Sequence, residues 1–260
     1  MPGVLIAVVA VLGLAVGSFL NVVIHRVPLG ESVVHPPSRC PACGAGIAAR
    51  HNVPVLGWLV LRGRCAHCGT RISVRYPLVE LGTAALFVVL ALRFDWPDLP
   101  AFLYFGAIGI ALAAIDLDCR RLPTAIVLPS YPVLAVLLAG SAWWQGDGWS
   151  LVRAVIGGAA LFGFYLLLAL AYPAGMGFGD VRLAGILGGV LAYVSWSALL
   201  IGAFAGFLLG AVTGVAILAA RKGDRKTAVP FGPFMIAGAL LAIFAAGPLA
   251  RAYDQLLGIA

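Results

Sequence analysis

Apolar residues occur along the chain in eight long runs, and most polar and charged residues lie in the segments between them. The runs cover approximately residues 3–24, 77–93, 100–116, 124–143, 151–172, 181–195, 197–219 and 230–250. An α-helix rises 1.5 Å per residue, so a run of about 20 residues crosses the ~30 Å hydrocarbon layer of a membrane. The pattern predicts about eight transmembrane helices, of which the sixth is short and rich in glycine.

Composition supports this interpretation, because 62% of the residues are hydrophobic and only 10% are charged. Soluble domains have about 25% charged residues. The expected fold class is therefore an all-α polytopic membrane protein. The chain starts with Met1-Pro2-Gly3, which has no basic residue, and the first apolar run is long for the core of a signal peptide. We expect a retained helix at 1–24, a loop domain at 25–76, and a seven-helix membrane core at 77–260.

The basic residues are distributed unevenly once these runs are threaded through a bilayer. Fourteen of the 17 Lys and Arg lie on the side of segment 25–76, and only Arg93, Arg153 and Arg251 lie on the other side. The positive-inside rule then predicts a cytoplasmic loop and external termini. This topology, with anionic lipid as partner, accounts for the net charge of +7, so we expect no nucleic-acid partner.

Segment 25–76 contains two Cys-x-x-Cys pairs separated by 21 residues: Cys40 with Cys43, and Cys65 with Cys68. This spacing is typical of four thiolates that bind one tetrahedral zinc ion. Gly44 and Gly69 follow the two pairs, as tight knuckle turns require. Two local disulfides or free thiols are the alternatives, and a reducing cytoplasm disfavours disulfides. Four thiolates leave no open coordination position, so the predicted zinc is structural.

Four carboxylates, Glu80, Asp116, Asp118 and Asp180, lie near helix ends at the predicted cytoplasmic face. Charge at membrane depth is costly, so these residues are candidates for function. The alternative is a helix-end charge that reaches the interface or, for Asp180, a cap at the start of the sixth helix.

Gly177 and Gly179 favour the functional interpretation of Asp180. A backbone without Cβ atoms can closely approach another chain or a substrate, and an ordinary cap does not need this freedom. If Asp116 reaches the same face, the pair can share a proton, one carboxylate activating water and the other protonating a leaving amine. All four histidines lie between positions 25 and 67, which disfavours a Ser–His dyad, and no His-Glu-x-x-His metal motif is present. The pattern predicts an intramembrane aspartic protease.

Motifs along nearly the whole chain carry a family resemblance. They are GSFLNVVIHRVP at 17–28, the two Cys pairs, LRGRC at 61–65, ISVRYPLVE at 72–80, Asp116-Leu117 with Leu122-Pro123, GFGD at 177–180, and VPFGP at 229–233. In this order they resemble the bacterial type IV prepilin peptidases, which are GxGD-type intramembrane aspartyl proteases.

The resemblance implies that Asp116 and Asp180 are the catalytic pair. It also implies cleavage of the short basic leader of type IV prepilins and pseudopilins at the cytoplasmic face of the inner membrane. N-methylation of the new N-terminal residue with S-adenosylmethionine is implied by the resemblance alone, since no site for that cofactor is recognisable. Asp118, Glu80 and Arg182 are candidate auxiliary residues, and Arg182 stands where the family favours Lys.

Two other classes of function compete with this hypothesis. In a proton- or cation-coupled transporter, Asp116, Asp118 and Asp180 would bind an ion at a broken helix. The predicted clustering at one face and the absence of a detectable inverted repeat argue against it. A non-catalytic zinc-loop scaffold of a secretion machine would leave the GFGD motif unexplained.

Overall fold

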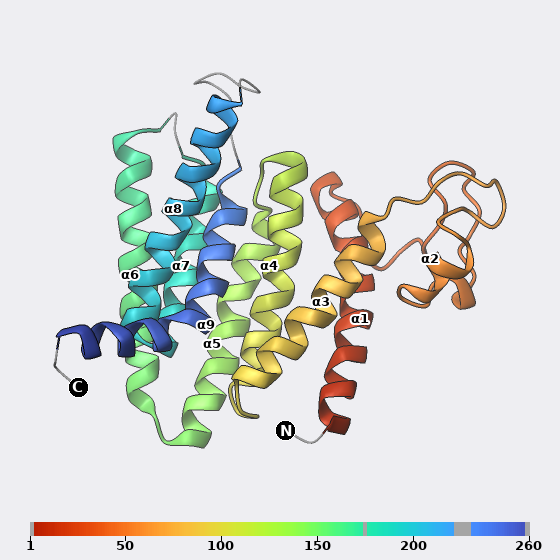
Figure 1. The fold of residues 1–260 in the computed structure, drawn as a ribbon. Helices are drawn as coiled ribbons and strands as arrows, with labels where there is room; N and C mark the ends of the chain where they lie inside the picture. The colour runs from red at the N-terminus through yellow and green to blue at the C-terminus, as the bar shows by residue number, and fades with distance from the viewer. Residues whose placement is uncertain (1–2, 174–175, 221–229, 258–260) are drawn as a thin grey trace. The chain divides into compact units, whose positions relative to one another are not determined.

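A computed structural model describes residues 3–173, 176–220 and 230–257, and within these ranges the chain forms helices and no β-strand. The long helices are α1 (Gly3–Arg26), α3 (Arg75–Arg93), α4 (Leu99–Cys119), α5 (Thr124–Gln145), α6 (Gly148–Ala171), α7 (Phe178–Val194), α8 (Trp196–Ala219) and α9 (Gly232–Leu257) (Figure 1). The segment between α1 and α3 holds the short helix α2 (Leu56–Val60) and two 3-10 turns, Val27–Leu29 and Ala49–His51.

Each apolar run of the sequence corresponds to one of these long helices, so the expected all-α membrane fold is confirmed. Among the described helices, seven are long and apolar enough to cross a membrane. The exception is α7, whose 17 residues span about 26 Å. It is the span that the sequence marks as short.

The chain divides into two compact units, Met1–Ala111 and Leu112–Ala260, and the division falls within α4. In the first unit, α1 packs along α3 (Figure 1). Gly17 permits this approach, because a Cβ there would lie 2.7 Å from Glu80 Cα. The side-chain amide of Asn21 donates to the carbonyl of Tyr76 at 3.1 Å, which fixes the start of α3 against α1.

In the second unit, α7 is the central helix and contacts α5, α6, α8 and α9. Most of its residues between Val181 and Tyr193 are buried. Its closest neighbour is α6, where a Cβ on Gly188 would collide with the carbonyl oxygen of Gly157. Lipid tails are as apolar as leucine, so small residues that allow close packing hold membrane helices together.

Arg153 of α6 fixes the far end of α7. Its guanidinium donates to the carbonyls of Ala192 at 3.1 Å and Tyr193 at 2.8 Å. The last carbonyls of a helix have no partner within the helix, so this side chain satisfies them. Packing along α7 and this cap together fix where α7 begins.

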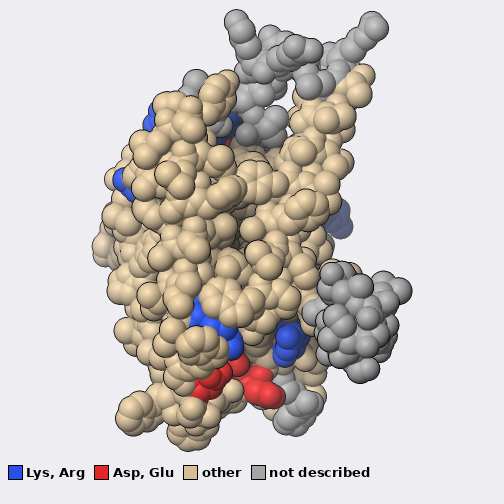
Figure 2. All heavy atoms as spheres, turned by 90° about the vertical axis from the view of Figure 1, so that its left-hand side faces the viewer, with Lys and Arg blue, Asp and Glu red and all other residues tan. Residues whose placement is uncertain are grey.

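Three exposed tryptophans, Trp143, Trp144 and Trp149, lie at the turn between α5 and α6. Tryptophan is enriched at the membrane interface. From Trp143 back to Thr124, α5 rises about 28 Å, close to one hydrocarbon thickness. Thr124 therefore lies near the opposite interface. Consistent with a lipid environment, most of the face in Figure 2 is uncharged.

Replacing Gly188 with Ala should destabilise the second unit, because the new methyl group overlaps the backbone of α6. Overpacking of this kind costs about 1–3 kcal/mol. The matched control is Gly163→Ala in α6, where a Cβ meets nothing within 4 Å. Thermal unfolding in detergent should show a lower midpoint for Gly188→Ala only; equal midpoints for the two variants would contradict the packing argument.

Candidate active site and metal centre

Asp116 lies in the last turn of α4 and is only 4% exposed. The amide of Gly232 donates to its Oδ2 atom at 3.0 Å. Gly232 is the first residue of α9, so the donor is one of the free amides at a helix N-terminus, where the helix dipole also favours negative charge. The start of α9 thereby supplies a partner that a carboxylate buried this deeply requires.

Asp180 is the third residue of α7, and Gly177 is the residue that precedes the helix. The Gly177 backbone lies beside the Asp180 carboxylate, since a Cβ on Gly177 would lie 3.4 Å from its Oδ2 atom. The Asp180 amide in turn donates to the Gly177 carbonyl at 3.0 Å. An acidic side chain at this helix position, close to the preceding residue, is placed as in half of a capping box. The carboxylate of Asp180 therefore lies at the first turn of α7.

Leu122, in the link between α4 and α5, lies between the helix starts that carry Gly179 and Gly232. A Cβ on Gly179 would lie 3.0 Å from Leu122 Cβ, and one on Gly232 would lie 3.2 Å from Leu122 Cδ2. The starts of α7 and α9 thus converge on one side chain, and the charges of Asp116 and Asp180 interact. Gly179 thus permits a close approach of α7 to Leu122 in the link between α4 and α5.

Gly232 lies in the sequence motif at 229–233, and the sequence alone assigns it no role in the site. A Cβ at this position would lie 2.8 Å from Oδ2 of Asp116, so only glycine leaves room for the carboxylate. The available signal is a glycine between Phe231 and Pro233 at the start of a helix. That pattern indicates a backbone constraint and gives no indication of the contact partner.

An aromatic cluster, made by Tyr165 of α6, Phe207 of α8 and Phe231, lies beside this site. The Tyr165 and Phe207 ring centroids are 5.4 Å apart, as are those of Phe207 and Phe231. Tyr165 is 1% exposed and interacts electrostatically with Asp180. Apolar walls of this kind lower the local dielectric and strengthen the interaction between the two carboxylates.

The candidate auxiliary carboxylates occupy other positions. Asp118 is exposed. It lies two residues after the buried Asp116, and residues two apart in a helix point to different faces. Glu80 belongs to the first unit, where its Oε2 accepts the Val55 amide at 2.6 Å. Val55 immediately precedes α2, so Glu80 attaches the loop domain to α3.

Arg182 lies one turn into α7, and its Nη1 atom donates to the Thr124 hydroxyl at 2.7 Å. Its guanidinium also lies over the Phe178 ring, 4.9 Å from the ring centroid. These contacts connect the first turns of α5 and α7.

The four cysteines of the loop cluster as the spacing predicts, with all four sulfurs within 4.8 Å of one another. Sγ of Cys40 and Sγ of Cys68 are 3.8 Å apart. In a tetrahedron with zinc–sulfur bonds of about 2.3 Å, the sulfurs are about 3.8 Å apart. The donor set therefore fits a single metal ion of the zinc type.

The two halves of the cluster are built alike. Gly44 and Gly69 have φ angles of 71° and 70°, and each donates its amide to the carbonyl of the first cysteine in its pair, at 2.9 and 3.0 Å. Only glycine adopts this backbone conformation at little cost, which confirms the expected knuckle turns.

Local hydrogen bonds favour thiolates at two of these positions. The backbone amides of Cys43 and Ala42 lower the pKa of Cys40. The hydroxyl and the amide of Thr70 lower the pKa of Cys68 to about 6. A metal ligand must be the thiolate, so these contacts prepare both sulfurs for coordination.

Two interacting carboxylates on membrane helices, with no histidine beside them among the described residues, define the class of site: a candidate intramembrane aspartic peptidase centre. The chain belongs to the type IV leader peptidase family, whose model matches residues 103–215. The model of the bacterial peptidase A24 N-terminal domain matches residues 11–94.

Curated relatives cover nearly the whole chain. A prepilin leader peptidase/N-methyltransferase of Pseudomonas putida is 37% identical over 99% of this chain and 96% of its own length. The protein of the same name from Aeromonas hydrophila is 35% identical, over 97% of this chain and 95% of its own length. One from Burkholderia pseudomallei is 37% identical, over 95% of this chain and 87% of its own length. No solved structure matches the chain. The matches favour the peptidase over the transporter and scaffold hypotheses.

Replacing Cys40 or Cys65 with Ser should remove the bound metal, because three thiolates and a hydroxyl are a much weaker donor set. Elemental analysis of protein purified without chelator should fall from about one metal ion per chain to near zero. Cys119→Ser is the control, since Cys119 is exposed and lies outside the cluster. Metal-free wild-type protein would refute the assignment.

Proposed function

We propose that this protein is an intramembrane aspartic endopeptidase that removes the short basic leader of type IV prepilins and pseudopilins. Gly179, next to Asp180, and Gly232, which donates to Asp116, both converge on Leu122, and this convergence is the observation that carries the proposal. The names of the relatives support the choice of substrate.

Asp116 and Asp180 together hold the proton that peptide hydrolysis needs. One carboxylate takes a proton from water as the water oxygen attacks the scissile carbonyl. The other gives its proton to the leaving amine as the carbon–nitrogen bond breaks. Like charges held near each other in a poorly solvated site do not both ionise readily, so the pair retains one proton between them.

The same protein is proposed to methylate the new N-terminal residue of the mature pilin, as the names of its relatives suggest. S-adenosylmethionine would supply the methyl group. We further propose that the four cysteines bind zinc and that the ion stabilises the loop domain. Glu80 of α3 holds the loop domain through the Val55 amide, and Asn21 of α1 holds the start of α3 through the Tyr76 carbonyl.

We also propose that the loop domain and the carboxylate pair face the cytoplasm, with both termini outside the inner membrane. The basic residues around the loop support this orientation. Four of the basic residues, Arg221, Lys222, Arg225 and Lys226, lie outside the described part of the chain.

Asp116→Asn and Asp180→Asn should each abolish leader cleavage by purified protein, because an amide keeps the shape but transfers no proton. Mass spectrometry of a prepilin substrate reports the loss of the leader and the gain of a methyl group in one measurement. Asp118→Asn is the control and should retain most of its activity. Wild-type cleavage should fall at both low and high pH, since the coupled pair needs one proton. Normal cleavage by a folded Asp180→Asn variant would exclude the mechanism.

Gly232→Ala should lower cleavage about tenfold or more, because the methyl group displaces the Asp116 carboxylate and misplaced catalytic groups are inefficient. The effect should fall on kcat, with the fold retained. Gly214→Ala in α8, where a Cβ meets nothing within 4 Å, serves as the control. If both variants cleave equally well, Gly232 does not position Asp116.

A further inference from the structure

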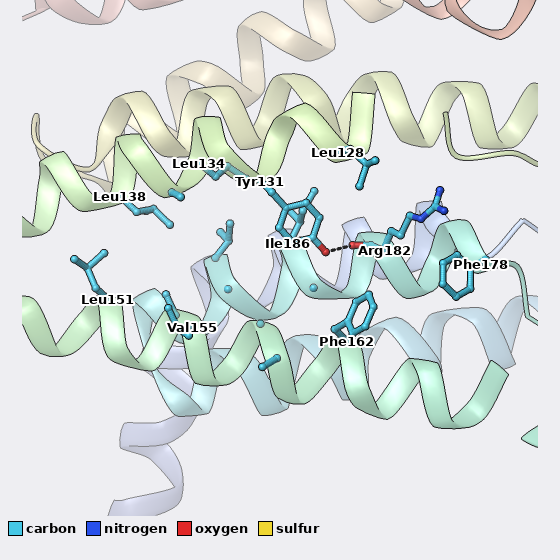
Figure 3. Close-up of a pocket in the computed structure, with 17 residues that line it drawn as sticks. Leu128, Tyr131, Leu134, Leu138, Leu151, Val155, Phe162, Phe178, Arg182 and Ile186 are labelled. Atoms are coloured by element: carbon cyan, nitrogen blue, oxygen red, sulfur yellow. Dashed lines mark hydrogen bonds between the residues drawn. The ribbon is translucent and has the colours of Figure 1, made fainter. Parts of the chain in front are cut away.

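An elongated groove of about 790 Å³ runs between α5, α6 and α7 (Figure 3). Its walls are almost entirely apolar, with contributions from all three helices, such as Leu134, Val155 and Ile186. Leu128 is 49% exposed and Val155 is 72% exposed, so the groove opens on the side of the helices that faces lipid. A volume of this size is typical of small-molecule sites.

The groove is distinct from the carboxylate site. On α7 it is lined by positions 178, 182, 185, 186, 189 and 190, which share one face of a helix. Asp180 lies two residues before Arg182, about 200° around the helix axis, and therefore on a different face. An occupant of the groove would contact α7 without contacting the carboxylates.

A single cation, Arg182, stands among the described residues that line the groove, and it lies at one end (Figure 3). The Tyr131 hydroxyl donates to the carbonyl of Arg182 at 2.6 Å, and the Thr124 hydroxyl accepts from its guanidinium at 2.7 Å. Because Thr124 begins α5 at the interface opposite the tryptophans, the guanidinium lies at the level of lipid headgroups.

We propose that this groove binds one anionic phospholipid, with its phosphate on Arg182 and an acyl chain along α7. The planar guanidinium matches phosphate geometry and can donate to two of its oxygens. From position 182 to position 190, α7 rises about 12 Å, close to the depth of one leaflet of a ~30 Å hydrocarbon layer. The charge at one end and the apolar length beyond it together match a lipid with a charged headgroup.

Native mass spectrometry of the full chain, released from bilayers that contain equal amounts of phosphatidylglycerol and phosphatidylcholine, tests the headgroup. Wild-type protein should retain phosphatidylglycerol preferentially. Arg182→Gln should reduce that preference about fivefold, the effect expected for one basic side chain at a membrane surface. Arg182→Lys keeps the charge and should keep most of the preference. Arg121→Gln, at an exposed arginine that does not line the groove, should have no effect.

Ala159→Trp and Ala160→Trp form a matched pair that tests the acyl-chain site. Both alanines are exposed on α6, and only Ala159 lines the groove. The tryptophan at 159 should reduce retention of both lipids, and the one at 160 should not. The proposal is overturned if Arg182→Gln keeps the wild-type preference, or if the two tryptophan variants retain lipid equally. It is also overturned if Ala159→Trp abolishes a dimer, or if a prepilin peptide crosslinks to position 159 while lipid does not.

Discussion

The backbone contact between α6 and α7 is the constraint on which the second unit depends. Asp180 lies at the start of α7, so any change in the position of that helix moves the carboxylate. Without a hydrophobic driving force between helices in lipid, the position must come from close packing and polar ties. Gly157 and Gly188 provide the packing, and Arg153 provides a tie at the far end. The result is a short central helix, surrounded by longer ones, whose first turn has a defined place.

Both carboxylates lie at the start of a helix. Asp116 accepts the first amide of α9, and Asp180 lies in the first turn of α7, beside Gly177. A helix N-terminus carries partial positive charge without a counter-ion of its own, so it lowers the cost of holding negative charge within a membrane. The aromatic cluster at Tyr165 and Phe207 supplies the low-dielectric side of the same site.

Local signals made much of this structure predictable from the sequence. The apolar runs specify the helices because their length must match the membrane, and the cysteine spacing specifies the cluster because both knuckles are short-range structures. The contact between Gly232 and Asp116 joins residues 116 positions apart, and no local pattern encodes it. The same holds for Leu122, an ordinary apolar residue whose role follows only from the two helix starts that meet on it. The hydrogen bond from Val55 to Glu80 likewise depends on how the loop folds back, which periodicity does not show.

Asp180 lies in the first turn of α7 beside Gly177, and in the proposed mechanism the same carboxylate transfers a proton. An ionised carboxylate in the first turn interacts favourably with the helix dipole. A proton on Asp180 removes that interaction, and loss of the proton restores it. If Asp180 transfers protons as proposed, the hold on the first turn of α7 weakens and recovers with the movement of a single proton.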